Sequence, residues 1–472
     1  MAMHTLSPAK PDPLDFLKDQ RVLVVGMGLS GLATAKVIQK SGAHVTVTDD
    51  RHTSGEGFAY QPPDQIDPKG FDLILLSPGI AHKGPHPHPL VVKALKAGTP
   101  LSSDVDLFFQ THPPVTTIGI SGTNGKSSTT SLIHCALSAL GQHSVMAGNI
   151  GVPILTVLPL EGKDVCVIEL SSYQLETVPH LSLDLAILLA ITPDHLARHG
   201  TLEAYAAQKR TLFNIGSAEG RCLYDAHDPW QAPFVRDAPH PHRFIPYAHG
   251  TPLKAGFFLI KDTLHDTYHT PHTTVKASFP HMAEATLLTS FAALRLLGHD
   301  AHAIIKAIKT WPGLAHRYER VIPSQHPAAN ITFINDSKAT NVEAAAFALK
   351  KSQGQPVFWI VGGRLKDQAD LTPWIPYLPF VTEAFPMGES AATVAQFLAD
   401  HHVHHIPCST LAAAYQEAVA AAARWVQSNP GKQVPLVLLS PGGASFDAFP
   451  HFEARGDHFK ALIQSDKTIK TL

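Results

Sequence analysis

The segment VTTIGISGTNGKSSTT, residues 115–130, places a β-branched apolar run before a glycine-containing loop and the first turn of a helix. This order predicts a buried strand, a tight loop and a helix whose apolar face includes Leu132, Ile133 and Ala136. Glycines let backbone N–H groups turn toward anionic oxygens, and the helix N-terminus adds partial positive charge. We therefore predict a phosphate-binding loop for a nucleoside triphosphate. Its contacts would come from Gly122, Thr123, Asn124, Gly125, Lys126, Ser127 and Ser128.

Two side chains of this loop have specific roles in such a site. Lys126 can reach the transferring phosphate, and Ser127 can hold Mg²⁺. The usual motif has its first glycine five positions before Gly125, where this chain has Ile120, whereas Gly119 lies six positions before it. A glycine turn that occurs by chance would not explain why strand, loop and helix follow one another in the required order.

The composition is that of a multidomain soluble protein. The chain has 472 residues, more than one hydrophobic core usually supports, so we expect two to three domains. It is 44% hydrophobic and 16% charged, and its formal net charge of −2 gives no general attraction to nucleic acid or membranes. The N-terminal residues lack a signal-peptide core, and no apolar run approaches a membrane span. We expect a cytoplasmic protein with reduced, mostly buried cysteines and small-molecule substrates.

The N-terminal region carries a second glycine loop. A strand over 21–25 leads into GMGLSG at 26–31, and a strand over 44–48 ends in DDR at 49–51. This is the dinucleotide-binding fingerprint, in which glycines admit a pyrophosphate to a helix N-terminus and an acid contacts a ribose or base. Because a further strand over 73–77 ends in a second loop, a sugar-nucleotide diphosphate fits the predicted crevice as well as a nicotinamide or flavin. A glycine turn that serves only helix packing is the structural alternative.

Polar residues also follow the strands after the phosphate loop. A strand over 164–170 delivers Glu169, and an apolar strand over 183–191 ends near Asp194 and His195. A carboxylate at the end of a strand beside a phosphate loop is placed to ligate Mg²⁺. The helix predicted over 202–213 carries Lys209, which by position alone is interpreted as a solvated cation. We assign no chemistry to residues 217–280.

The last third of the chain predicts another doubly wound α/β unit. Its strands over 331–334, 357–361 and 436–439 each run into a polar or glycine-rich loop, and helices over 391–399 and 411–426 alternate with them. The fold class is thus α/β with three domains. We place a Rossmann-like domain at 1–108, a central phosphate-loop domain at 109–313 and a C-terminal Rossmann-like domain at 314–472.

Taken together, these motifs resemble the Mur ligase family along nearly the whole chain, and in particular its D-glutamate-adding members. The matching segments are GTNGKS at 122–127, ELSSYQLE at 169–176, DHLARHG at 194–200, HR at 316–317, NDSKATN at 335–341 and LLSPGGASFDAFPHF at 438–452. The resemblance implies an ATP-dependent ligase that adds D-glutamate to UDP-N-acetylmuramoyl-L-alanine through an acyl phosphate. ADP and phosphate would be released, and the reaction would belong to cytoplasmic peptidoglycan precursor synthesis.

The resemblance also implies site residues, in four groups. UDP-muramoyl-alanine would contact Gly28, Leu29, Ser30, Asp49, Asp50, Arg51, Ser77, Gly79 and Asn149. ATP would contact the phosphate loop, Arg317 and Asp336. D-Glutamate would contact Lys338, Thr340, Lys366, Ser445 and Phe452. The catalytic residues would be Lys126, Glu169, His195 and Lys209, and two Mg²⁺ ions would be held by Ser127, Glu169, His195 and Lys209.

Lys209 matches the family lysine that reacts with CO₂ to form a carbamate. The modification turns a cation into an anionic oxygen ligand beside a divalent metal, which makes physical sense. Two lysines, Lys338 and Lys366, would face the dicarboxylate substrate and match its charge. We expect a monomer whose third domain closes on the central one when ligands bind, because an acyl phosphate must be kept from water.

The chain departs from the family pattern at several places, and three alternatives stay open. Ala190 and Ala197 replace a usual Asn and Asp, and HMAEA at 281–285 stands where the family has an Asn-containing adenine motif. These changes leave a non-catalytic nucleotide sensor as one alternative. A folylpolyglutamate-type ligase would not need the fingerprint at 26–50. A nicotinamide-dependent oxidoreductase would leave Lys126 and the third domain unexplained.

Overall fold

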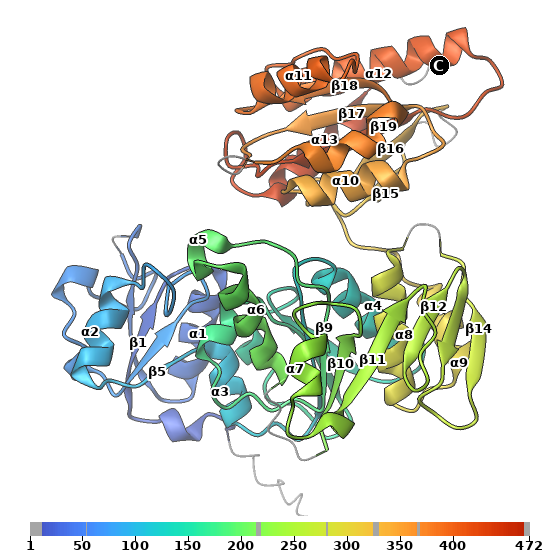
Figure 1. The fold of residues 1–472 in the computed structure, drawn as a ribbon. Coiled ribbons are helices and arrows are strands. Elements are labelled where there is room, and N and C mark those ends of the chain that lie inside the picture. Colours follow the sequence, from blue (N-terminus) through green and yellow to red (C-terminus); the bar gives the residue numbers. More distant parts are fainter. Residues whose placement is uncertain are drawn as a thin grey trace, which may run out of the picture. The chain divides into compact units, whose positions relative to one another are not determined.

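The computed structural model describes residues 12–52, 54–213, 219–279, 282–323, 330–365 and 369–466. These residues form three β-sheets with helices packed against them (Figure 1). The chain divides into two compact units, of which the first ends at Trp311 and the second begins at Pro312. Two sheets lie in the first unit and one in the second, so the α/β fold class predicted from the sequence is confirmed. The domain boundaries at 108 and 313 stay a prediction.

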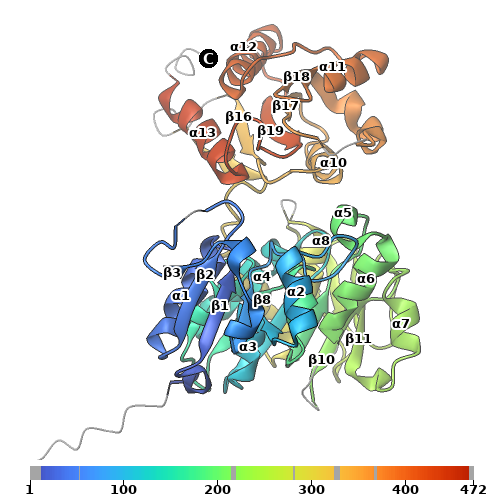
Figure 2. The same ribbon diagram turned by 90° about the vertical axis from the view of Figure 1, so that its left-hand side faces the viewer.

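The first sheet has the strand order β3-β2-β1-β4-β5, and its strands are parallel. Its elements are β1 (Arg21–Val25), α1 (Leu29–Lys40), β2 (His44–Thr48), β3 (Ala59–Tyr60), β4 (Leu73–Leu76), α2 (Pro89–Ala97), β5 (Leu101–Ser102) and α3 (Asp104–Gln110). Val22 and Val24 join the core around α1, whereas Leu23 and Val25 join the core around α2 (Figure 2). The strand order reverses between β1 and β4, which is where open α/β sheets bind ligands.

The central sheet has nine strands in the order β14-β13-β12-β11-β10-β9-β6-β8-β7. Its strands are β6 (Thr116–Ser121), β7 (Ser144–Gly148), β8 (Val165–Glu169), β9 (Leu185–Leu188), β10 (Arg221–Asp225), β11 (Phe244–His249), β12 (Phe257–Ile260), β13 (Thr263–Asp266) and β14 (Thr273–Lys276). Its helices are α4 (Lys126–Ala139), α5 (Leu196–His199), α6 (Leu202–Arg210), α7 (Ala232–Arg236), α8 (Glu284–Leu296) and α9 (Ala301–Ile308). The pairs β12–β13 and β13–β14 are antiparallel, and the other pairs are parallel. Because β6 lies between the buried strands β8 and β9, its loop opens beside the ends of both.

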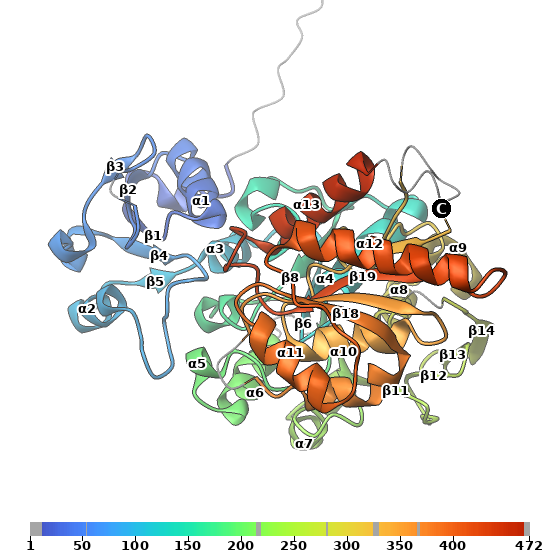
Figure 3. The ribbon, with the colours of Figure 1, turned by 90° about the horizontal axis from the view of Figure 1, so that it is seen from above.

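The second unit has the strand order β15-β16-β19-β17-β18, in which only the β15–β16 pair, among the described strands, is antiparallel. Its elements are β15 (Glu319–Val321), β16 (Thr332–Asn335), α10 (Val342–Lys351), β17 (Val357–Gly362), β18 (Val381–Met387), α11 (Ala391–Asp400), α12 (Leu411–Ser428), β19 (Leu436–Gly442) and α13 (Phe452–Ser465). Phe358 and Ile360 join the core under α12, whereas Trp359 and Val361 join the core under α10 and α11 (Figure 3). This unit is therefore doubly wound.

Short 3₁₀ helices connect these elements. They are η1 (Asp15–Leu17), η2 (Pro63–Gln65), η3 (Pro68–Gly70), η4 (Ile154–Val157), η5 (Gln174–Thr177), η6 (Thr211–Phe213), η7 (Pro241–Arg243) and η8 (Thr372–Phe380). The four cysteines are free thiols, and Cys166 and Cys222 are buried. Within the described ranges, no helix is both long and apolar enough to cross a bilayer.

Candidate active site

The phosphate loop predicted from the sequence forms between β6 and α4. Gly122 and Gly125 have φ values of +147° and +83°, which residues other than glycine rarely adopt. A Cβ on Gly122 would also lie 2.5 Å from the Cβ of Leu189, on the segment that follows β9. The predicted order of strand, loop and helix is confirmed, and the helix begins at Lys126.

Lys126 lies over its own loop. Its Nζ donates hydrogen bonds to the carbonyl oxygens of Gly122 at 3.0 Å and Thr123 at 2.8 Å. Thr123 in turn donates through Oγ1 to the carbonyl of Thr192 at 3.0 Å, which ties the loop to the end of β9. The loop thus combines an ammonium group with the exposed N–H groups of a helix N-terminus, the combination that binds phosphate oxygens.

Glu169 ends β8 in the position directly beside the phosphate-loop strand. Its neighbour across the sheet is Ile120, and its Oε1 accepts a hydrogen bond from Nδ2 of Asn149 at 2.7 Å. Its Oε2 is buried and has no hydrogen-bond partner in the part of the chain that the structure describes. Burying a carboxylate oxygen without a hydrogen-bond donor costs folding free energy, unless a cation binds to that oxygen. The donor set therefore fits a hard divalent ion such as Mg²⁺.

Lys209 is the most unusual charged residue of the site. It lies on α6 with only 1% of its surface exposed, and its Nζ donates to the carbonyl of Gly122 at 2.6 Å. The interpretation from position alone, a solvated cation, is therefore wrong. Burial lowers the pKa of Lys209 well below its ordinary value, and the charge of Lys126 lowers it further against the opposing effect of Asp194 and Glu169. A buried amine, whose unprotonated form is favoured by this burial, thus lies under the phosphate loop.

His195 lies at the edge of an aromatic cluster. It precedes α5 with a left-handed backbone (φ +52°), and its Nδ1 is 3.0 Å from the hydroxyl oxygen of Tyr173. Its ring contacts those of Tyr173 and Tyr205, with centroids 5.0 and 6.4 Å away, and both of these rings contact His199. Tyr205 also packs against Lys209, whose Nζ is 4.7 Å from the ring centroid. The central-domain candidates thus lie on different elements: Lys126 begins α4, Glu169 ends β8, His195 precedes α5 and Lys209 is on α6.

In the first sheet, the two predicted ligand loops hold each other. Ser77 donates through Oγ to the carbonyl of Gly26 at 2.8 Å. Asp49 accepts the N–H groups of Met27 at 2.7 Å and Arg51 at 2.8 Å. Although burial opposes it, these bonds and those from His52 lower the pKa of Asp49 to about 2, so the carboxylate is ionised at neutral pH.

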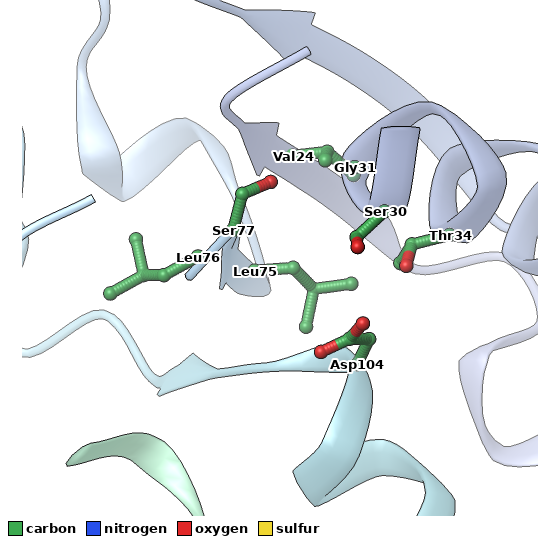
Figure 4. Close-up of a pocket in the computed structure, with 8 residues that line it drawn as sticks. All are labelled: Val24, Ser30, Gly31, Thr34, Leu75, Leu76, Ser77 and Asp104. Atoms are coloured by element: carbon green, nitrogen blue, oxygen red, sulfur yellow. The ribbon is translucent and has the colours of Figure 1, made fainter. Parts of the chain in front are cut away.

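The helix side of these loops encloses a small cavity. It is lined by Val24, Ser30, Gly31, Thr34, Leu75, Leu76, Ser77 and Asp104 (Figure 4). Leu29, at the start of α1, is 80% exposed, and Asp50 is paired with Nε2 of His88 at 3.1 Å. An exposed apolar side chain beside ionised and polar groups suits a ligand with a flat ring and a charged tail.

The described candidates of the second unit lie before β15, on the loops after β16 and β19, and at the start of α13. The Nζ of Lys338 is 3.9 Å from the ring centroid of Phe452, and Ser445 is buried. Arg317 stands between His316 and Tyr318, whose backbones are both left-handed, a strain that is typical of functional sites. Lys366 and His281 lie outside the described residues.

Arg455, a residue that the sequence analysis missed, organises these loops. Its buried guanidinium donates to the Oγ and carbonyl oxygen of Ser337 at 3.0 and 2.8 Å, and to the carbonyl of Gly443 at 3.0 Å. Ser337 donates onward to the carbonyl of Phe452 at 2.8 Å. One side chain on α13 therefore fixes both loops that carry the predicted amino-acid contacts.

The partly buried Asp336 predicts a pH dependence of the free energy of unfolding. Burial raises its pKa from 3.8 to about 7, although Ser440 and the N–H of Tyr318 donate to it. Between these two values the unfolded state binds fewer protons than the folded state, so stability falls as pH rises from about 4 to about 7. Asp336→Asn should remove most of this slope. Urea unfolding followed by tryptophan fluorescence at pH 4, 5.5 and 7 measures it, and equal slopes in variant and parent would contradict it.

Comparison with known proteins decides the family. Residues 120–296 match the Mur ligase middle domain. The chain is 37% identical to the UDP-N-acetylmuramoylalanine–D-glutamate ligase of Paramagnetospirillum magneticum, over 95% of this chain and 97% of that protein. The chain belongs to the Mur ligase family. This Mur ligase is also 37% identical to the enzyme of the same name from Brucella abortus, with 96% and 97% of the two chains covered.

A solved structure supports the fold of this Mur ligase. The MurF ligase from Thermotoga maritima, solved in complex with ADP, has a TM-score of 0.57 at 14% identity and covers 97% of both chains. At that identity the likeness concerns the fold alone. The 37% identity to the two named ligases confirms the family resemblance inferred from the motifs.

Proposed function

We propose that this Mur ligase joins D-glutamate to UDP-N-acetylmuramoyl-L-alanine, with ATP converted to ADP and phosphate, in peptidoglycan precursor synthesis. The observation that carries the proposal is the arrangement of Lys126, Glu169 and Lys209 around one phosphate loop. It occurs in a chain that matches relatives named D-glutamate ligases over nearly its whole length. Its cellular location would be the cytoplasm, and its working form a monomer.

In this proposal the phosphate loop and Lys126 bind the ATP phosphates. The carboxylate of the muramoyl-alanine attacks the γ-phosphate, and the resulting acyl phosphate is attacked by the amine of D-glutamate. Magnesium ions would supply charge neutralisation for the transferring phosphoryl group. Ser127, Glu169, His195 and a carbamate on Lys209 would hold them. The unpartnered Oε2 of Glu169 supports this assignment.

A carbamate at Lys209 requires an unprotonated amine, because nitrogen attacks CO₂ with its lone pair and then releases a proton. Burial lowers the pKa of Lys209 well below that of an ordinary lysine, which favours the unprotonated amine. Neighbouring positive charge would favour the modified state, because an anionic oxygen in this position would face both Lys126 and the metal ions.

D-Glutamate would bind to the second unit through Lys338, Thr340, Lys366, Ser445 and Phe452, and Arg317 and Asp336 would contact ATP. Arg455 would position these loops without touching the substrate. Closure of this unit on the central domain would exclude water from the acyl phosphate.

The uridine diphosphate would lie on the loops at 26–31, 49–51 and 77–79, and Asn149 would face the muramoyl part. Gly31→Ala tests this placement, because its Cβ would overlap the carbonyl oxygen of Gly26 and lie 2.6 Å from Oγ of Ser77. The strain of about 1–3 kcal/mol that such overpacking causes should raise the KM for the UDP-sugar by tenfold or more, with the KM for ATP unchanged.

Gly70→Ala is the matched control for this variant. A Cβ on Gly70 meets no atom of the described chain within 4 Å. Steady-state kinetics with each substrate varied in turn measures the effect, and an unchanged KM for the UDP-sugar in Gly31→Ala would place that ligand elsewhere.

The proposed activity is tested by phosphate release. The protein is incubated with Mg·ATP and UDP-N-acetylmuramoyl-L-alanine, and D-glutamate, L-glutamate or D-aspartate is added in separate reactions. We expect release that depends on both the UDP-sugar and D-glutamate, together with a product heavier by one glutamyl residue. Release with another amino acid alone, or a nicotinamide-dependent reaction without phosphate release, would reject the proposal.

A further inference from the structure

Arg198 and Glu176 form a nearly buried pair between the first and second sheets of the first unit. The Nε and Nη2 of Arg198 donate to Oε1 and Oε2 of Glu176 at 3.0 and 2.8 Å. Only 11% and 1% of the two side chains are exposed. Such a two-pronged pair holds a guanidinium in one orientation.

The same guanidinium holds the ligand loop that follows β4. Arg198 donates through Nη2 to the carbonyl of Ile80 at 2.9 Å and through Nη1 to that of Gly79 at 3.3 Å. Glu176 adds contacts of its own, because its Oε2 accepts the N–H groups of His82 and Lys83 at 3.3 Å each. Backbone groups of residues 79, 80, 82 and 83 are thus held by two side chains of the central domain.

The guanidinium of Arg198 also contacts the aromatic ring of Tyr173, which lies beside His195 in the central domain. Its carbon is 4.6 Å from the ring centroid of Tyr173. That ring packs edge-on against His195 with centroids 5.0 Å apart, and its hydroxyl is 3.0 Å from Nδ1 of His195. A cation over an aromatic face is attracted by the ring, more strongly when both are shielded from water.

We propose that Arg198 is a positioning residue that sets the separation between the UDP-sugar loop and His195, through the Glu176 pair on one side and the Tyr173 ring on the other. This rests on the proposed function, because it assumes that the loop at 77–80 binds the UDP-sugar. The attacking carboxylate and the γ-phosphate then approach one another at a distance that Arg198 fixes. A change of about 1 Å in that distance is enough to cost a hundredfold in rate.

The test uses two variants. Arg198→Lys keeps the positive charge but loses the bidentate hydrogen bonds to Glu176, and Tyr173→Leu removes the aromatic ring. In the full-length protein, each variant should lower kcat by about tenfold or more. The Kd for UDP-N-acetylmuramoyl-L-alanine, measured by calorimetry without nucleotide, should change by less than about threefold. The double variant should be no slower than the slower single variant by more than about twofold, because both changes break the same connection.

Arg21→Lys is the matched control, since Arg21 forms a similar fork with Asp72 on the surface of the first sheet. It should leave kcat unchanged.

The proposal would be overturned by a wild-type kcat in either Arg198→Lys or Tyr173→Leu, by losses in kcat that multiply in the double variant, or by weaker binding of the UDP-sugar with kcat unchanged. If Arg198→Lys does not fold, as shown by lost binding of a non-hydrolysable ATP analogue, Tyr173→Leu decides alone. If the wild type uses another amino acid, the proposed function fails, and the same comparison with that amino acid still tests Arg198.

Discussion

Lys209→Ala is expected to lower turnover by about a hundredfold to a thousandfold, the effect of removing one preorganised electrostatic group from a phosphoryl-transfer site. A short carboxylic acid such as acetate or propionate should restore part of the activity. The reason is steric and electrostatic: the deleted side chain would leave room for an acid whose oxygens replace those of the proposed carbamate. Phosphate release with increasing acid measures the rescue.

The control for this prediction is Lys306→Ala, because Lys306 is an exposed lysine on α9 of the same unit. It should have wild-type turnover and no response to added acid. Carbon-13 spectra of the protein in labelled bicarbonate should show a carbamate signal that is lost in Lys209→Ala and kept in Lys306→Ala. Full turnover in Lys209→Ala would remove Lys209 from the mechanism.

Glu169→Gln should change activity and stability in opposite directions. The neutral amide is less costly to bury than a carboxylate with an unpartnered oxygen, so the metal-free variant should be more stable by about 1–3 kcal/mol. Its turnover should fall by about a hundredfold, and more Mg²⁺ should be needed for half-maximal rate, because a charged oxygen ligand is lost.

Thermal unfolding in EDTA, together with kinetics over a range of Mg²⁺ concentrations, measures both effects. Glu417→Gln, at an exposed position of α12, is the control and should change neither. A variant that is destabilised without metal, or whose Mg²⁺ requirement is unchanged, would show that Glu169 has a structural role.

Much of the fold could be predicted from the sequence because local signals agreed with tertiary packing. The strands at 21–25 and 44–48 form as predicted, since the first is a short apolar run and the second alternates valine with polar residues. Residues 217–280 were harder to interpret. They contain β10 to β14, which are short and separated by turns, and which make cross-strand contacts such as the stacking of Phe258 on His265.

The candidate site was predictable where a motif fixes the backbone and unpredictable where burial decides. The glycine pattern predicts the phosphate loop. The burial of Lys209, in contrast, depends on how α6 packs under Gly122, and the sequence does not distinguish a buried helical lysine from an exposed one. Arg455 was missed for the same reason. Its signal, an arginine on the side of α13 that faces the sheet, can be recognised only once the helix face is known.

The tight packing of Gly31 against Gly26 bears on how resistance to inhibitors could arise. A compound that hydrogen-bonds only to main-chain groups of the loop at 26–31 would depend on atoms that no point mutation deletes. A side chain at Gly26 or Gly31 would overlap atoms of the neighbouring loops, so substitutions at these two positions are disfavoured. A compound that depends on the side chain of Asp50, which is largely exposed, would meet no such barrier. Main-chain recognition is therefore the more durable basis for inhibitor design against this enzyme.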